Sequence, residues 1–145
     1  MTAPIVVCHA CVKPNRVDLS RAVGKKPLCG HCKAPLPLEN GIQRVTAQTL
    51  PVLLAASEMP VVVDFWAPWC GPCRSFAPVY QQAAGKWADQ VVLAKLDTEA
   101  EPAGGQRFQI QAIPTLVGFK AGREVHRQSG ALPPAQLDAF LRQIT

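Results

Sequence analysis

Six cysteines are the residues of this 145-residue chain with the clearest chemical potential. They form three pairs with the spacing Cys-x-x-Cys: Cys8/Cys11, Cys29/Cys32 and Cys70/Cys73. Two such pairs in sequence are typical of a four-thiolate metal site, and a pair that follows a strand and opens a helix is typical of thiol–disulfide exchange. A secreted disulfide framework is disfavoured, because the apolar start of the chain has no basic residue ahead of it and makes a poor secretory signal.

The third pair lies in the segment Trp69-Cys-Gly-Pro-Cys73, directly after an apolar stretch. We expect Cys70 at the exposed start of a helix, where free backbone N–H groups and the helix dipole favour a thiolate. Cys70 is then the attacking nucleophile, and Cys73, shielded one turn further in, resolves the mixed disulfide. Pro72 suits the first helical position, and Gly71 keeps the loop open to a partner.

The first two pairs, Cys8/Cys11 and Cys29/Cys32, are separated by 17 residues and fit one zinc ion with four thiolate ligands. Gly30 is expected to permit the tight turn of its knuckle. Zinc would hold together a segment too small for a core of its own. His9 and His31 lie inside the knuckles. If either were a zinc ligand, one of the four cysteines would remain unbound, so we place both histidines outside the first coordination sphere.

A second redox centre is the alternative for Cys29/Cys32. Cys29-Gly-His-Cys32 is also the active-site tetrapeptide of protein disulfide isomerase. The context argues against this interpretation, because no hydrophobic strand precedes Cys29, and Pro35 and Pro37 disfavour a following helix.

The net charge of +5 is concentrated in residues 1–40, which hold six basic and two acidic residues. A nucleic-acid contact is one interpretation; we favour charge compensation for a zinc–thiolate centre with a local charge of −2. Residues 1–40 contain no Phe, Trp or Tyr, which argues against base stacking. The apolar runs are far too short to span a bilayer, so we expect a cytoplasmic protein without membrane insertion.

The elements that must position these cysteines follow an α/β pattern after a boundary near residue 40. Pro35–Gly41 is predicted to be a linker or turn, and residues 1–40 show no helical period. Thr46 can cap the first of four predicted helices. The predicted strands are 43–45, 61–66, 91–96, 115–119 and 124–128, and the predicted helices are 47–57, a segment from about 72, a weaker 101–108, and 133–143. This order predicts a parallel half followed by an antiparallel hairpin.

These motifs, together with Asp64-Phe-Trp-Ala67, Pro78, Ile113-Pro-Thr115 and Gly130-Ala-Leu132, resemble the thioredoxin family over about residues 42–145. With the N-terminal cysteines included, the whole chain is similar to the zinc-containing bacterial members. The resemblance implies a thioredoxin fold, a central mixed sheet flanked by helices, at 41–145, with a small zinc-ribbon-like domain at 1–40. It also implies a protein-disulfide reductase, recharged by an NADPH-linked thioredoxin reductase. We take the protein to be a monomer by default. The chain has no dinucleotide fingerprint of its own.

The resemblance assigns further roles. Asp64 is implied to be a buried acid of raised pKa that moves the proton of Cys73, and Lys95 to pair with it, although a solvated edge lysine is the alternative. Cis-Pro114 and Ile113 are implied to offer backbone groups to an extended substrate. Trp69 would belong to the docking surface, Trp66 to the core, and Gly130 would let a partner backbone approach.

Two other functions stay open. The cysteine-rich segment could be a binding module for nucleic acid or protein, with the redox domain as its scaffold. The zinc site could also sense oxidation, since oxidised thiolates would release the metal and alter partner choice.

Overall fold

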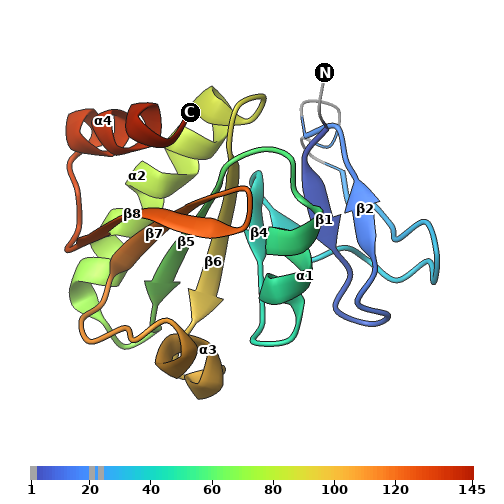
Figure 1. Ribbon diagram of the computed structural model, residues 1–145, viewed down its shortest axis with the longest axis horizontal. Coiled ribbons are helices and arrows are strands. Elements are labelled where there is room, and N and C mark those ends of the chain that lie inside the picture. Colours follow the sequence, from blue (N-terminus) through green and yellow to red (C-terminus); the bar gives the residue numbers. More distant parts are fainter. Residues whose placement is uncertain (1–2, 20–21, 23–24) are drawn as a thin grey trace.

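A computed structural model describes residues 3–19, 22 and 25–145 of the chain. Its main element is a six-stranded mixed sheet of order β3-β4-β6-β5-β7-β8 (Figure 1). Strands β4, β6 and β5 are mutually parallel, whereas β5–β7 and β7–β8 are antiparallel. The predicted parallel half followed by a hairpin is therefore confirmed. The six strands are β3 (Leu38–Glu39), β4 (Ile42–Arg44), β5 (Val61–Trp66), β6 (Val92–Asp97), β7 (Thr115–Lys120) and β8 (Arg123–Ser129).

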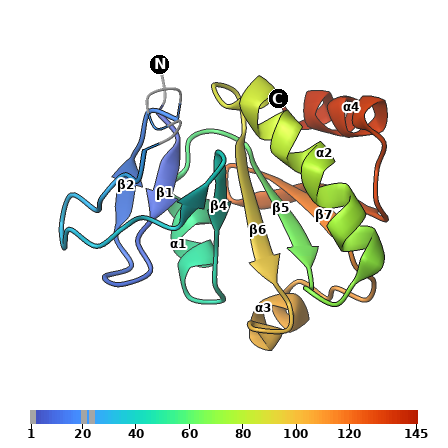
Figure 2. The same cartoon turned by 180° about the vertical axis from the view of Figure 1, so that it is seen from behind.

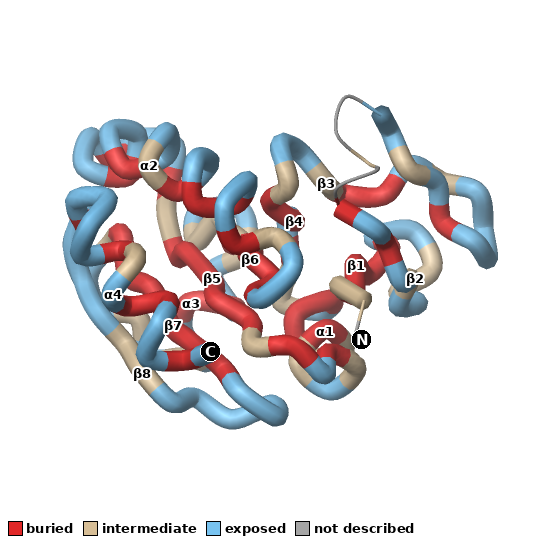
Figure 3. The backbone as a smooth tube through the Cα atoms, turned by 90° about the horizontal axis from the view of Figure 1, so that it is seen from above, coloured by how far each residue is buried: buried red, intermediate tan, exposed pale blue. Residues whose placement is uncertain are grey.

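Helices cover both faces of this sheet, and each face has its own apolar core. Alternation along β5 divides the cores, because successive strand residues point to opposite faces. Val62 packs with α2 (Gly71–Trp87) and α4 (Pro134–Ile144), whereas Val61 and Val63 pack with α1 (Thr49–Ala56). Figure 2 shows α2 crossing the sheet on one face, and Figure 3 shows the buried strands at the centre of the molecule.

The predicted elements from residue 42 onward all exist, with ends displaced by a few residues at most. The strand 61–66 matches β5 at both ends, and the strand 91–96 is displaced by one residue from β6. The N-cap residue of α1 is Gln48 and not Thr46 as predicted, although the Thr46 hydroxyl does accept the backbone N–H of Thr49, the first helical residue, at 3.0 Å. The weak third helix is present as α3 (Pro102–Arg107).

The segment before residue 42 departs from the sequence analysis. Leu38–Glu39 is not a linker but strand β3, paired antiparallel with β4 through the predicted turn at Asn40-Gly41. Further upstream, β1 (Ile5–Val7) and β2 (Pro14–Arg16) form a two-stranded antiparallel sheet that was not predicted. Strands of two or three residues leave too little alternation for a sequence pattern.

The β1–β2 sheet lies beside β4 of the large sheet (Figures 1 and 2). Ile5 and Val7 are buried in the α1 core. The amide of Gln43, itself buried, donates to Ile5 O at 2.8 Å and accepts from Val7 N at 2.9 Å. One side chain thus bonds to β1 much as a neighbouring strand would, which joins the N-terminal segment to the rest of the molecule.

The glycine pair of α3 gives a stability prediction. A Cβ at Gly104 would lie 2.7 Å from Cδ1 of buried Leu96, whereas one at Gly105 would meet Thr98 at an ordinary 3.4 Å. We expect Gly104→Ala to destabilise the oxidised protein by about 1–2 kcal/mol, because overpacking outweighs the gain in helix propensity. Gly105→Ala, the matched control, should be neutral or stabilising by up to about 1 kcal/mol. Urea unfolding of both variants measures the difference, and equal stabilities would contradict the prediction.

Candidate functional site

Cys70 and Cys73 form a disulfide at the junction of β5 and α2. Cys70 is the N-cap residue of α2, and its Sγ accepts the backbone N–H of Cys73 at 3.2 Å. This bond directs a free donor of the first helical turn at the sulfur expected to become a thiolate. The sequence analysis expected Cys70 to be exposed, but it is only 5% exposed, against 2% for Cys73, because the loop around Ile113 covers it.

The loop before β7 faces the disulfide. The Ile113–Pro114 peptide bond is cis, and the carbonyl oxygen of Ile113 lies 3.9 Å from Cys70 Sγ. The far end of the loop is tied to β8, because Gly130 N donates to Pro114 O at 2.8 Å. Thr115 Oγ1 donates to Ala112 O at 2.5 Å. The cis peptide agrees with the sequence-based expectation.

Two further predicted substrate contacts lie at the surface. Trp69 is 67% exposed beside the disulfide. Gly130 has a φ of +100°, and no atom lies within 4 Å of the place where a Cβ would stand. A side chain there would be strained by the backbone and would project into open space that a partner could use.

Asp64 lies behind the disulfide on β5 and is 4% exposed. Burial raises its pKa to about 7, although the charge of Lys95 acts in the opposite direction. Lys95 stands opposite Asp64 in the β5–β6 register. The ion pairs of the described residues do not include Asp64–Lys95; the Lys95 ammonium lies 4.7 Å from the ring centre of Trp66 instead.

A cavity of about 130 Å³ connects this acid to the resolving cysteine. Asp64, Trp66, Lys95 and Cys73 line it, together with Glu39 of the β3–β4 hairpin. Among the described residues, Asp64 Oδ1 and Trp66 Nε1 are buried and have no hydrogen-bond partner. A cavity lined by polar residues is the setting in which water binds, so water can link the carboxyl group to Cys73.

Asp64 should make stability depend on pH. An unfolded-state pKa near 3.8 and a folded-state value of about 7 mean that the folded state holds the proton more tightly, so the contribution of Asp64 to stability falls as pH rises between these values. We expect the free energy of unfolding of wild type to fall by about 2–3 kcal/mol between pH 5 and pH 8 because of Asp64, and we expect Asp64→Asn to show no such fall. Urea unfolding of both oxidised proteins at these two pH values measures it. Equal losses in both proteins would contradict the raised pKa.

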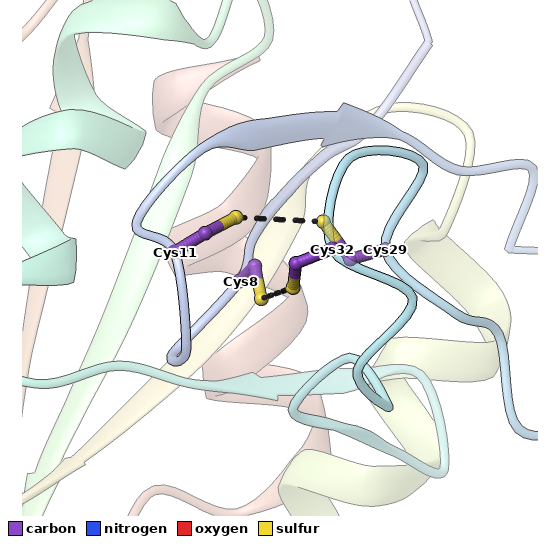
Figure 4. A group of neighbouring side chains, drawn as sticks. All are labelled: Cys8, Cys11, Cys29 and Cys32. Carbon is purple, nitrogen blue, oxygen red and sulfur yellow. Dashed lines mark hydrogen bonds between the residues drawn. The ribbon is translucent and has the colours of Figure 1, made fainter.

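The four N-terminal cysteines converge on one point, as Figure 4 shows. Their sulfur atoms all lie within 4.8 Å of one another, and two of the pairs, Cys8/Cys32 and Cys11/Cys29, are 3.6 Å apart. These separations are too long for disulfides. Zn–S bonds of about 2.3 Å in a tetrahedron place sulfurs about 3.8 Å apart. The four side chains therefore fit a tetrahedral zinc ion.

The two cysteine loops share one backbone pattern. Cys8 N donates to Lys13 O and Val12 N to Cys8 O; the second loop repeats these bonds between Cys29, Lys33 and Ala34. The residue after each pair has a positive φ, +60° at Val12 and +67° at Lys33. The turn was expected to depend on Gly30, which has no such φ, so this expectation was wrong.

The polar groups around Cys29 favour its thiolate. Hydrogen bonding from the backbone N–H of Cys32 is the largest influence that lowers the pKa of Cys29, to about 5, and the N–H of His31 and the amide of Asn15 act in the same direction. Asn15 also accepts the N–H of Gly30 at 2.9 Å, so it connects β2 to the second cysteine loop. His9 bonds to Arg44 O at 2.8 Å, which occupies a ring nitrogen away from the sulfurs.

The comparisons with known proteins decide the family. The thioredoxin family profile matches residues 41–143. The chain belongs to the thioredoxin family. Thioredoxin C-3 of Corynebacterium nephridii is 41% identical over 140 residues, 96% of this chain and 94% of that protein. The rice chloroplastic thioredoxin Y is 43% identical over 66% of this chain and 56% of its own length.

A solved structure confirms the thioredoxin fold. The thioredoxin of Malassezia sympodialis (Mala s 13) superposes with a TM-score of 0.65 at 31% identity, covering 71% of this chain and 90% of that one. The chain is therefore a thioredoxin-type thiol–disulfide oxidoreductase whose active-site disulfide is Cys70–Cys73. Thioredoxins reduce disulfides of target proteins. Within the described residues, every helix is too short or too polar to cross a bilayer.

Sequence reasoning missed several residues that hold this site in place. Gln43 joins β1 to the large sheet, and Asn15 joins β2 to the second cysteine loop. The Tyr80 hydroxyl forms hydrogen bonds with Val62 O and Ala94 O, which fixes α2 to the centre of the sheet. Gln43 carried no clear signal, because β4 reads Ile-Gln-Arg and a polar residue in such a strand ordinarily faces water. Asn15 and Tyr80 carried none, because their partners are distant in sequence.

Proposed function

We propose that this thioredoxin is a general protein-disulfide reductase with a structural zinc centre, of the kind known as thioredoxin 2. Residues 1–40 form a zinc-binding domain with ligands Cys8, Cys11, Cys29 and Cys32, and residues 41–145 form the thioredoxin domain. One observation carries the zinc assignment: four cysteine sulfurs from two loops of identical backbone pattern lie within 4.8 Å of one another. The alignment with thioredoxin C-3, over 96% of the chain, extends into this segment.

In the proposed reaction the Cys70 thiolate attacks one sulfur of a target disulfide, and the other target sulfur leaves as a thiolate that takes up a proton. Cys73 then loses its proton and attacks Cys70 Sγ, which releases the second target thiol and leaves Cys70–Cys73 oxidised. Asp64 accepts the Cys73 proton through the cavity between them, and its raised pKa suits this task near neutral pH. An NADPH-linked thioredoxin reductase restores the dithiol.

The target segment docks in extended form across the surface around the disulfide. The residues proposed to contact it are Trp69, Gly71, Pro72, Ile113, Pro114 and Gly130. The exposure of Trp69 and the open space at Gly130 support this role. We further propose that the protein is a cytoplasmic monomer, and that its basic N-terminal segment balances the zinc–thiolate charge instead of binding nucleic acid.

Zinc content and reactive thiols, measured together on protein purified under reducing conditions, test the proposal. We expect one zinc per chain, with Cys70 and Cys73 as the only rapidly titrated thiols, because bound thiolates react slowly. Absence of zinc with more than two reactive thiols would contradict the zinc centre and favour a second redox pair at Cys29/Cys32. Reduction of insulin in the presence of NADPH and thioredoxin reductase tests the catalytic part separately.

A further inference from the structure

Arg127 on β8 binds the segment that leads from α3 to the cis-proline loop. Its Nη2 donates to Phe108 O at 2.8 Å, and its Nη1 donates to Gln109 O at 3.4 Å. Glu124 holds the other side of the guanidinium, with bonds of 2.9 Å to Nε and 2.7 Å to Nη2. The planar fork of arginine allows it to bind the carboxylate and both carbonyl groups at once.

The segment that Arg127 binds follows the end of α3, a short helix that contains two glycines. Gln109 N donates to Gln106 O and Ile110 N donates to Gly105 O, each at 3.0 Å, whereas the carbonyl groups of Phe108 and Gln109 accept from Arg127. Gln109 has a φ of +55°, which is disfavoured for a residue other than glycine. The bond from Ile110 N to Gly105 O supports this conformation from the helix end, and Arg127 adds support from β8 through the Gln109 carbonyl group.

Phe108 fixes the same place from the opposite side. Its ring packs between Phe65 and Phe119, with centroid distances of 5.7 and 5.5 Å. Between this anchor and the bond from Gly130 N to Pro114 O, the chain runs only from Gln109 to Ile113. Arg127 and Gly130 thus hold the two ends of the loop that carries the Ile113 carbonyl to the disulfide.

We infer that Arg127 is a positioning residue for this loop and determines how well protein disulfides dock. The inference rests on the proposed docking role of Ile113 and Pro114. An extended protein segment uses backbone groups of the loop, so its binding depends on a fixed loop. A small aromatic disulfide needs only the Cys70 sulfur, so its reduction should depend little on Arg127.

Kinetics with the full-length, zinc-loaded protein test this role. Wild type, Arg127→Ala and Arg127→Lys are compared in steady state on insulin, with NADPH and thioredoxin reductase as the reductant. The same proteins, pre-reduced, are compared in a single turnover on 5,5′-dithiobis(2-nitrobenzoic acid). We expect Arg127→Ala to raise KM for insulin about 3- to 10-fold with little change in kcat, and to leave the small-disulfide rate within about 2-fold. Arg127→Lys keeps the charge opposite Glu124 but loses the fork, so we expect an intermediate KM.

Two controls separate the possible failures. Glu124→Gln keeps both carbonyl bonds of Arg127 and should resemble wild type. Ile113→Ala alters the loop directly and should weaken insulin binding if the loop docks the substrate. An unchanged KM in Arg127→Ala, with a raised KM in Ile113→Ala, overturns the inference alone; unchanged values in both overturn the docking proposal as well. Equal slowing of both substrates would show a general structural role and would also overturn the inference.

Discussion

Replacement of Cys73 by serine is expected to stop turnover and leave the first chemical step intact. Cys70 keeps its position at the N-terminus of α2, where backbone N–H groups stabilise a thiolate. It can therefore still attack a target disulfide, but no second thiol follows to release the product. We expect reduction of insulin to fall by at least about 10³-fold, to the uncatalysed background.

The stalled intermediate should be visible. A covalent adduct between the Cys73→Ser variant and its target should accumulate on a non-reducing gel and disappear with dithiothreitol. Cys70→Ser is the matched control and should form no adduct, because the nucleophile is absent. An adduct in both variants would place a second nucleophile outside this pair, and Cys32, the exposed cysteine of the N-terminal cluster, would be the first candidate.

Loss of the metal should have the second large effect, confined to the N-terminal segment. Ile5 and Val7 bury their side chains against α1, but the rest of the N-terminal segment has only a small apolar cluster, to which Cys8 and Cys29 themselves belong. Structural zinc in small domains contributes on the order of 10 kcal/mol to folding. We expect Cys29→Ser, or chelation of wild type, to unfold this segment and to leave the domain from residue 41 onward folded.

Limited proteolysis and zinc content measure this effect. New cleavage sites should appear before residue 40, and the protease-resistant remainder should still reduce a small disulfide. His9→Ala is the matched control: it alters the first cysteine loop, but His9 is bonded to Arg44 O and is not a proposed ligand. It should keep its zinc. A Cys29→Ser variant that resists proteolysis as wild type does would show that packing on α1 suffices.

The fold from residue 42 onward could be read from the sequence because local signals agree with the tertiary structure there. Strand β5 is a β-branched run between prolines, and α4 has apolar residues at helical spacing. The sequence could not reveal β1 and β2, because they depend on Gln43, the α1 core and the cysteine loops. Their formation is decided by contacts distant in the chain.

The site residues were predictable where the chemistry requires a particular residue type. They were less predictable where the role of a residue depends on the conformation of its side chain. The roles of the cysteine pairs follow from spacing and context, whereas the buried acid was implied only by the family resemblance. Lys95 shows the limit: the register places it opposite Asp64, yet its ammonium lies over Trp66, an arrangement that depends on side-chain conformation. Arg127 gave no signal, because a charged residue on an edge strand ordinarily means a solvated surface.

Gln43 has a consequence for how such a segment is gained or lost in evolution. Its amide is buried and, among the described residues, forms hydrogen bonds only with β1. In a relative without the N-terminal segment, this amide would be buried without partners or exposed at the side of the sheet. Replacing the glutamine by an apolar residue would then cost no stability. A glutamine at this position should therefore occur together with the cysteine-rich extension. The identity of this one residue of the thioredoxin domain then indicates whether the extension is present.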